Sequence, residues 1–216
     1  MGWQRSGPTL TDTDMMYILR RMEKYGLYRE KRVSAAIRIV ANENHYHPIR
    51  DYLNDLKWDG TERISHALHR FLGAAEDELT AEALKIFLLG AIKRVFHPGC
   101  KFEMMLCLVG GQGAGKSSFF RLLAIKDEWF SDDLRRMDDD NVFRKLQGHW
   151  IMEMSEMIAT ANAKSIEEIK SFLSKQKETY KIPYETHPAD RLRQCVFAGT
   201  TNRQDFLPRD RTGNRR

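Results

Sequence analysis

A glycine-rich loop between an apolar run and a helical pattern is the feature that most constrains the fold of this chain. The apolar run covers residues 104–109, and residues 118–123 continue at helical spacing after the loop. The loop reads Gly110-Gly111-Gln112-Gly113-Ala114-Gly115-Lys116-Ser117. It matches the phosphate-binding pattern G-x-x-x-x-G-K-[ST], and it lies between a strand and a helix, as that pattern requires.

Each residue type in this loop has a physical role in holding a triphosphate. Glycines let backbone N–H groups turn inward and approach phosphate oxygens at positions where side chains would collide with them. The helix that follows adds its positive N-terminal end. We expect residues 110–118, with Ser118 as the last, to bind ATP, Lys116 to reach the β- and γ-phosphates, and Ser117 to hold Mg²⁺. The alternative is a tight glycine-rich turn that binds no ligand.

The composition is that of a globular protein with a hydrophobic core. Among 216 residues, 42% are hydrophobic and 30% are charged, and the net charge of +5 permits a polyanionic partner without proving one. Cys100, Cys107 and Cys195 lack metal-ligand spacing, which favours inert thiols in a reducing compartment. Because no window resembles a membrane span or a signal peptide, we expect a cytoplasmic protein without membrane contact.

Apolar periodicity predicts helices over the first hundred residues. The first helix is expected from Thr11 to Tyr25, because a Thr-x-x-Asp cap precedes apolar residues at helical spacing. Further helices are expected at residues 33–40, from Pro48, after a Thr61 cap, and from Thr80 to His97. We expect these helices to pack directly on the domain that follows.

Strands alternate with helices after the loop, which predicts a parallel α/β sheet. The expected elements are a short strand at 129–131, a buried strand at 150–154, a helix at 165–176, a hairpin at 178–193 and a strand at 194–199. The chain therefore divides into a helical N-terminal region, residues 1–100, and a nucleotide-binding α/β core, residues 101–216.

Polar residues at the carboxyl ends of the strands are the candidates for chemistry, because open α/β sheets bind ligands there. Glu156 follows the strand at 150–154 and is positioned to orient a water or to reach Mg²⁺. Glu153 lies inside that strand, where it is either a second acid that lies beside the metal or positions the water, or a paired structural charge. Asn202 ends the next strand, where its amide would bond the γ-phosphate or the attacking water; the alternative is an ordinary Asn turn.

Basic residues gather in two further places. Five arginines crowd the C-terminus, and one supplied by a neighbouring subunit would neutralise charge on the transferring phosphoryl group; they are Arg203, Arg209, Arg211, Arg215 and Arg216. The hairpin at 178–193 presents either basic and aromatic groups to a nucleic-acid strand or an ordinary charged surface. Its candidate DNA contacts are Lys181, Tyr184, His187, Arg191 and Arg193.

Longer stretches of the sequence resemble the virulence-associated protein E (VapE) family of phages, prophages and pathogenicity islands. The resemblance runs from about His47 to the last residue. It is carried by HPIRDYLNDLKWDGTERI, FHPGCKFEMMLCLVGGQGAGKSSFFRLLA, WFSDDL, LQGHWIMEMSEM, EEIKSFLSKQKETYKIPY and CVFAGTTNRQDFLPRDRTGNRR. That family is similar to superfamily 3 helicases and phage primase-helicases, which have AAA+-type P-loop NTPase cores and work as rings on DNA.

The resemblance implies a Mg²⁺-dependent ATPase that acts on DNA as a helicase or replication motor and assembles as a homo-oligomeric, hexamer-like ring. The roles it implies fall on Lys116 and Ser117 in the loop, Glu156 as the acid, Asn202 as the sensor, and Arg215 or Arg216 as the arginine finger. The hairpin at 178–193 would touch DNA. Two alternatives stay open, a nucleotide-dependent binding switch without unwinding activity and a small-molecule P-loop kinase.

One departure from the family pattern concerns the C-terminus. The sequence stops at Arg216, where members of the family continue with an apolar strand and often further domains. The resemblance therefore implies that the last core strand is missing and that the edge of the strand at 104–109 is unpaired. We expect reduced stability, and a chain extended through the next strand should melt at a higher temperature.

Overall fold

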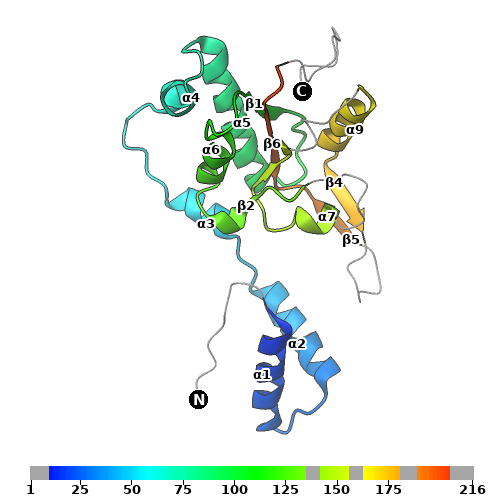
Figure 1. Cartoon of the computed structure of the whole chain (residues 1–216). Helices are drawn as coiled ribbons and strands as arrows, with labels where there is room; N and C mark the ends of the chain where they lie inside the picture. Colours follow the sequence, from blue (N-terminus) through cyan, green and yellow to red (C-terminus); the bar gives the residue numbers. More distant parts are fainter. Residues whose placement is uncertain (1–9, 135–141, 156–162, 181–188, 205–216) are drawn as a thin grey trace. The chain divides into compact units, whose positions relative to one another are not determined.

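The computed structural model describes residues 10–134, 142–155, 163–180 and 189–204 (Figure 1). The chain forms two compact units, Met1–Pro48 and Ile49–Arg216. The sequence predicted a boundary at residue 100, where helices give way to strands. The boundary between the compact units lies at residue 48 instead. None of the helices in the described ranges is both long and apolar enough to span a membrane.

The first unit is a helical hairpin. Helix α1 (Asp12–Glu23) begins with the expected capping box, in which Thr11 N donates to Asp14 Oδ2 at 2.9 Å and Asp14 N donates to Thr11 Oγ1 at 3.2 Å. The chain turns at Gly26, whose φ of +75° lies in the left-handed region that glycine adopts without strain. Helix α2 (Glu30–Glu43) then runs back beside α1 (Figure 1).

The second unit is built on a parallel sheet of four strands, which confirms the α/β class expected from the sequence. The strand order is β1-β6-β3-β2, with β1 (Met105–Val109), β6 (Val196–Thr201), β3 (Ile151–Glu153) and β2 (Phe130–Ser131). All six residues of β6 are buried, as expected for an inner strand covered on both faces. Strand β1 lies at the edge of the described sheet.

Helices cover both faces of this sheet and enclose two hydrophobic cores. The helices are α3 (Pro48–Asp55), α4 (Ile64–Leu72), α5 (Glu78–Phe96), α6 (Lys116–Leu123), α7 (Val142–Lys145) and α9 (Ala163–Ser174). Ile151 belongs to the core that α5 and α6 share with the sheet, and Met152 to the core with α9. Because successive residues of a strand face opposite sides, β3 separates the two cores. Helix α5 packs directly on the sheet, as expected, and Trp150 Nε1 donates to Ala91 O at 3.0 Å.

Two predicted helix starts were wrong. Helix α4 begins after Arg63 rather than after a Thr61 cap. Thr61 N instead donates to Asp59 Oδ1 at 3.0 Å, and hydrogen bonds from Arg63 hold the pKa of Asp59 well below its ordinary value. Helix α5 begins before Thr80, because the carboxylate of Asp77 accepts from Thr80 N at 2.8 Å and caps the helix two residues earlier than expected.

The thiols of the sheet are protonated, as expected for inert core cysteines. Burial raises the pKa of Cys107 to about 12 and that of Cys195 to about 11. At neutral pH neither side chain is a thiolate, which is the reactive form. All three cysteines are free.

Gly90, inside α5, allows the ring of Phe102 to lie against the helix. A Cβ atom at position 90 would stand 2.2 Å from that ring. Alanine usually stabilises a helix by about 1 kcal/mol relative to glycine, but overpacking here should cost roughly 1–3 kcal/mol. We expect Gly90→Ala to lower the melting temperature measured by circular dichroism, by about 2–4 °C for each kcal/mol lost.

The paired control for this prediction shortens the neighbouring ring. Gly90→Ala combined with Phe102→Leu should recover part of the lost melting temperature, because the smaller side chain leaves space for the new methyl group. A higher melting temperature for Gly90→Ala alone would contradict the contact, since it would mean that helix propensity decides the outcome.

Candidate nucleotide-binding site

The glycine loop joins the end of β1 to the first residue of α6, Lys116. Gly113 and Gly115 both have a φ of +79°, a backbone conformation in which a side chain would be strained. Gly115 is the N-cap residue of α6, and no side chain caps the helix there. The first N–H groups of α6 are therefore left for a ligand, and an anion is favoured at this end of the helix.

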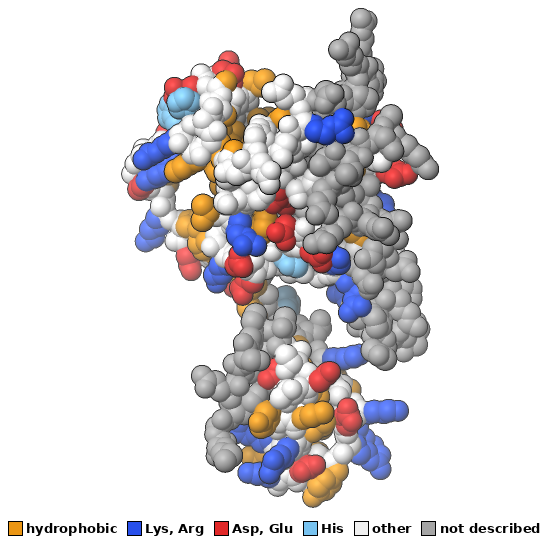
Figure 2. Space-filling model, viewed as in Figure 1, with side chains coloured by type: hydrophobic (Ala, Val, Ile, Leu, Met, Phe, Trp, Pro, Cys, Tyr) orange, Lys and Arg blue, Asp and Glu red, His pale blue; other side chains and the backbone are white. Residues whose placement is uncertain are grey.

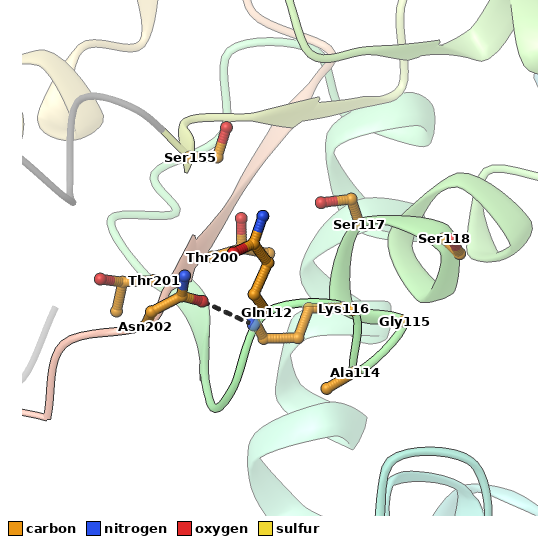
Figure 3. A pocket seen from close by; sticks show the side chains of 11 residues that line it. Gln112, Ala114, Gly115, Lys116, Ser117, Ser118, Ser155, Thr200, Thr201 and Asn202 are labelled. Atoms are coloured by element: carbon orange, nitrogen blue, oxygen red, sulfur yellow. Dashed lines mark hydrogen bonds between the residues drawn. The ribbon is translucent and has the colours of Figure 1, made fainter.

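A cavity of about 420 Å³ lies at the loop, at the carboxyl ends of the strands (Figure 3). This volume is within the range typical of small-ligand pockets. The lining comes from the loop and the start of α6, from a residue just after β3, and from the end of β6. These residues are Gln112, Gly113, Ala114, Gly115, Lys116, Ser117, Ser118, Ser155, Thr200, Thr201 and Asn202. The cavity thus contains most of the loop positions selected from the sequence.

Lys116 folds back across its own loop toward Asn202 (Figure 3). Its Nζ donates to Gly110 O at 2.8 Å, to Gly111 O at 2.7 Å and to Asn202 Oδ1 at 3.0 Å. Two residues 86 positions apart in the sequence therefore meet in the cavity. All three acceptors are neutral oxygens, and no acidic side chain within the described ranges pairs with the amine. Its charge is thus available to an anionic ligand.

Glu153, the last residue of β3, lies against the serine of the loop. It is 1% exposed, and its Oε1 accepts from Ser117 Oγ at 2.7 Å and from Thr200 Oγ1. Its Oε2 is buried and has no hydrogen-bond partner in the part of the chain that the structure describes. An ionised carboxylate is costly to bury without a cation. Among the described residues, Glu153 is paired with two hydroxyl groups and with no cation. The carboxylate, its unpartnered Oε2 and the Ser117 hydroxyl are oxygen ligands that fit a divalent ion.

A model of the virulence-associated protein E-like domain matches residues 53–216. The chain belongs to this family. The match confirms the resemblance that its sequence shows to VapE proteins.

Three solved structures of the C-terminal region of NrS-1 are similar to this VapE-like domain. Two of them share 16% and 17% identity with it, each with a TM-score of 0.46 over 64% of this chain, and the third shares 15% with a TM-score of 0.44 over 65%. This chain spans about a third of those structures, 32% or 33% of each. No curated protein matches it.

Several predicted site residues of the VapE-like domain lie outside the described residues, and their roles stay predictions. They are Glu156, Lys181, Tyr184, His187, Arg209, Arg211, Arg215 and Arg216. Sequence reasoning assigned no role to Thr200, although the structure joins it to Glu153. The only signal was its place in the Thr-Thr-Asn run at the end of a buried strand.

The hairpin expected at 178–193 is present as antiparallel strands β4 (Lys177–Tyr180) and β5 (Ala189–Leu192). Arg193 was wrongly predicted to contact DNA. It is 3% exposed, its Nε donates to Glu178 Oε1 at 2.8 Å, and its guanidinium lies 4.3 Å from the centre of the Phe172 ring. Arg193 therefore holds the base of the hairpin, whereas Arg191 is half-buried.

Breaking this buried pair should be strongly destabilising. We expect Arg193→Ala to lower the free energy of unfolding by roughly 3–5 kcal/mol, because buried Glu178 would lose its closest cation and keep only the exposed Lys175 at 3.9 Å. Replacing both residues, as Glu178→Leu with Arg193→Met, should cost much less. Urea unfolding followed by circular dichroism measures both variants, and an unchanged midpoint for Arg193→Ala would contradict the pairing.

Proposed function

We propose that this chain is a P-loop NTPase of the AAA+ type, a Mg²⁺-dependent ATPase that acts on DNA as a helicase or replication motor of a mobile element. The observation that carries the proposal is the hydrogen bond between Ser117 and Glu153. It joins the hydroxyl of a phosphate-loop motif to a buried carboxylate from another strand. Strand β6, which ends next to Asn202, lies between β1 and β3. The loop and the amide therefore line one cavity, and Glu153 is joined to that cavity through Ser117 and Thr200.

Five side chains in and beside the cavity have proposed tasks. Lys116 exchanges its three neutral acceptors for oxygens of the β- and γ-phosphates, and the N–H groups of the loop bind the same phosphates. Ser117 and Glu153 would hold Mg²⁺, which supplies the positive charge that neutralises the phosphates. Asn202, placed by its hydrogen bond with Lys116, orients the γ-phosphate or the attacking water. Glu156 is the proposed acid that readies this water.

Family membership supports the DNA-related part of the proposal through the similarity of VapE proteins to superfamily 3 helicases. By the same similarity, the protein works as a homo-oligomeric ring in the cytoplasm, where Arg215 or Arg216 of one subunit completes the site of its neighbour. The proposed DNA contacts of the core are Arg191 and, from the segment between β4 and β5, Lys181, Tyr184 and His187.

ATP hydrolysis with and without single-stranded DNA tests the proposal. We expect turnover that requires Mg²⁺, stops with a chelator and rises when DNA is added. A nucleotide-dependent switch would bind a fluorescent ATP analogue without DNA-stimulated turnover. A flat titration of the folded protein with that analogue would rule out the motor, the switch and the kinase together.

A further inference from the structure

The turn between α1 and α2 concentrates the positive charge of the chain. Residues 20–32, here called the basic turn, read RRMEKYGLYREKR and hold six basic and two acidic residues. Their net charge of +4 compares with +5 for the whole chain. The basic residues are Arg20, Arg21, Lys24, Arg29, Lys31 and Arg32, and all six are exposed.

Helix stability accounts for only part of this charge. Arg20 and Arg21 lie in the last turn of α1, where cations interact favourably with the negative end of the helix dipole. Three more cations lie at the start of α2: Arg29, Lys31 and Arg32. The N-terminal end of a helix carries the positive end of its dipole, so these cations are unfavourable there. None of the six pairs with an acidic side chain within the described ranges. Their charge is therefore left for an external polyanion.

Aromatic rings and an apolar groove accompany these cations. Tyr25 is 71% exposed and Tyr28 is 74% exposed, although large aromatic side chains usually bury most of their surface. A groove of about 810 Å³ between the helices is lined by Tyr28, Arg29 and Arg32 together with apolar side chains such as Ile37. Figure 2 shows hydrophobic and basic side chains interspersed on this unit.

We propose that the basic turn binds single-stranded nucleic acid, with its cations on the phosphates and Tyr25 and Tyr28 stacked on bases. Single-strand sites combine these two features, whereas a duplex keeps its bases stacked inside and offers mainly phosphates to a basic surface. The turn lies outside residues 53–216, which the family model matches. The contact is separate from the proposed ATPase and needs no nucleotide.

The test is fluorescence anisotropy of a labelled oligothymidine, without ATP, over a series of salt concentrations. Arg29→Gln with Lys31→Gln and Arg32→Gln should weaken binding at least about tenfold and reduce the slope of log affinity against log salt by about 2, since each phosphate contact on a single strand contributes about 0.7. Tyr25→Ala with Tyr28→Ala should weaken binding about tenfold or more with the slope unchanged.

The matched control removes the same charge elsewhere. Lys57, Arg70 and Lys93 are exposed and belong to the second unit, and their replacement by Gln should leave both affinity and slope near those of the wild type. The variant at the start of α2 should melt no lower than the wild type, because it removes cations from the positive end of a helix. Lys116→Ala should bind the oligonucleotide as the wild type does. Failure of the proposed ATPase function can therefore be told apart from failure of the proposed nucleic-acid binding by the basic turn.

Five outcomes would overturn the proposal. Unchanged affinity and slope in the α2 variant would show that these cations touch no phosphate, and an equal loss in the control would show that net charge alone decides binding. Tighter binding of duplex DNA, or binding of phosphatidylserine vesicles without the oligonucleotide, would assign the turn to another polyanion. A dimer that the tyrosine variant dissolves, with no oligonucleotide bound, would assign the groove to a second copy of the chain.

Discussion

Lys116→Ala should abolish ATP hydrolysis while the protein stays folded. Lys116 meets only neutral oxygens in the cavity, so no structural carboxylate depends on its charge, and under the proposed function that charge would stabilise phosphate. Removing one donor aimed at developing charge costs about 10²–10³-fold in turnover, and we expect at least this loss here. Phosphate release measures it, and a fluorescent ATP analogue measures the accompanying loss of binding.

Lys126→Ala is the matched control for this prediction. Lys126 is exposed just beyond the C-terminal end of α6 and contacts the ring of Trp129, so the variant removes the same charge away from the cavity. It should keep turnover near that of the wild type. Retained hydrolysis in Lys116→Ala, or equal losses in both variants, would count against the assigned role.

Glu153→Gln should lower turnover by about 10²–10³-fold and leave the melting temperature unchanged or higher. The amide keeps an oxygen that can accept from Ser117 and Thr200, so the hydrogen bonds to Glu153 Oε1 have a substitute. The change also removes a buried charge that has no cation partner among the described residues, and burying such a charge is costly. Loss of activity without loss of stability is the signature of a functional acid.

Glu156→Gln, measured beside it, separates the roles of the two acids. If Glu153 holds Mg²⁺ and Glu156 readies the water, Glu153→Gln should weaken Mg²⁺-dependent nucleotide binding, whereas Glu156→Gln should keep binding and lose turnover. Full turnover in Glu153→Gln, or a large drop in its melting temperature, would mean that Glu153 is a structural charge.

The α/β class and the position of the glycine loop could be predicted from the sequence because both depend on local patterns. The glycines at 113 and 115 adopt positive φ values that their own residue type permits. Strand β6 is apolar through Ala198 and buried throughout, which is what its composition indicates for an inner strand. The start of α1 was also predictable, because the two residues of its capping box, Thr11 and Asp14, are only three positions apart in the sequence.

Apart from the starts of α4 and α5, contacts between distant residues were what the sequence could not show. Arg193 is a basic residue of the kind that contacts DNA, yet the fold buries it against Glu178 and Phe172. The sequence also could not show that β3, β6 and α6 bring Glu153 together with Ser117 and Thr200.

The sequence by itself determined where the glycine loop lies, the approximate positions of most strands and helices, and which family the chain resembles. Only the tertiary structure decided that Lys116 meets Asn202, that Glu153 meets Ser117, and that Arg193 is buried. The physical reason is that backbone conformation and amphipathic periodicity are properties of neighbouring residues, whereas a buried charge acquires its partner only when strands far apart in the chain align in one sheet.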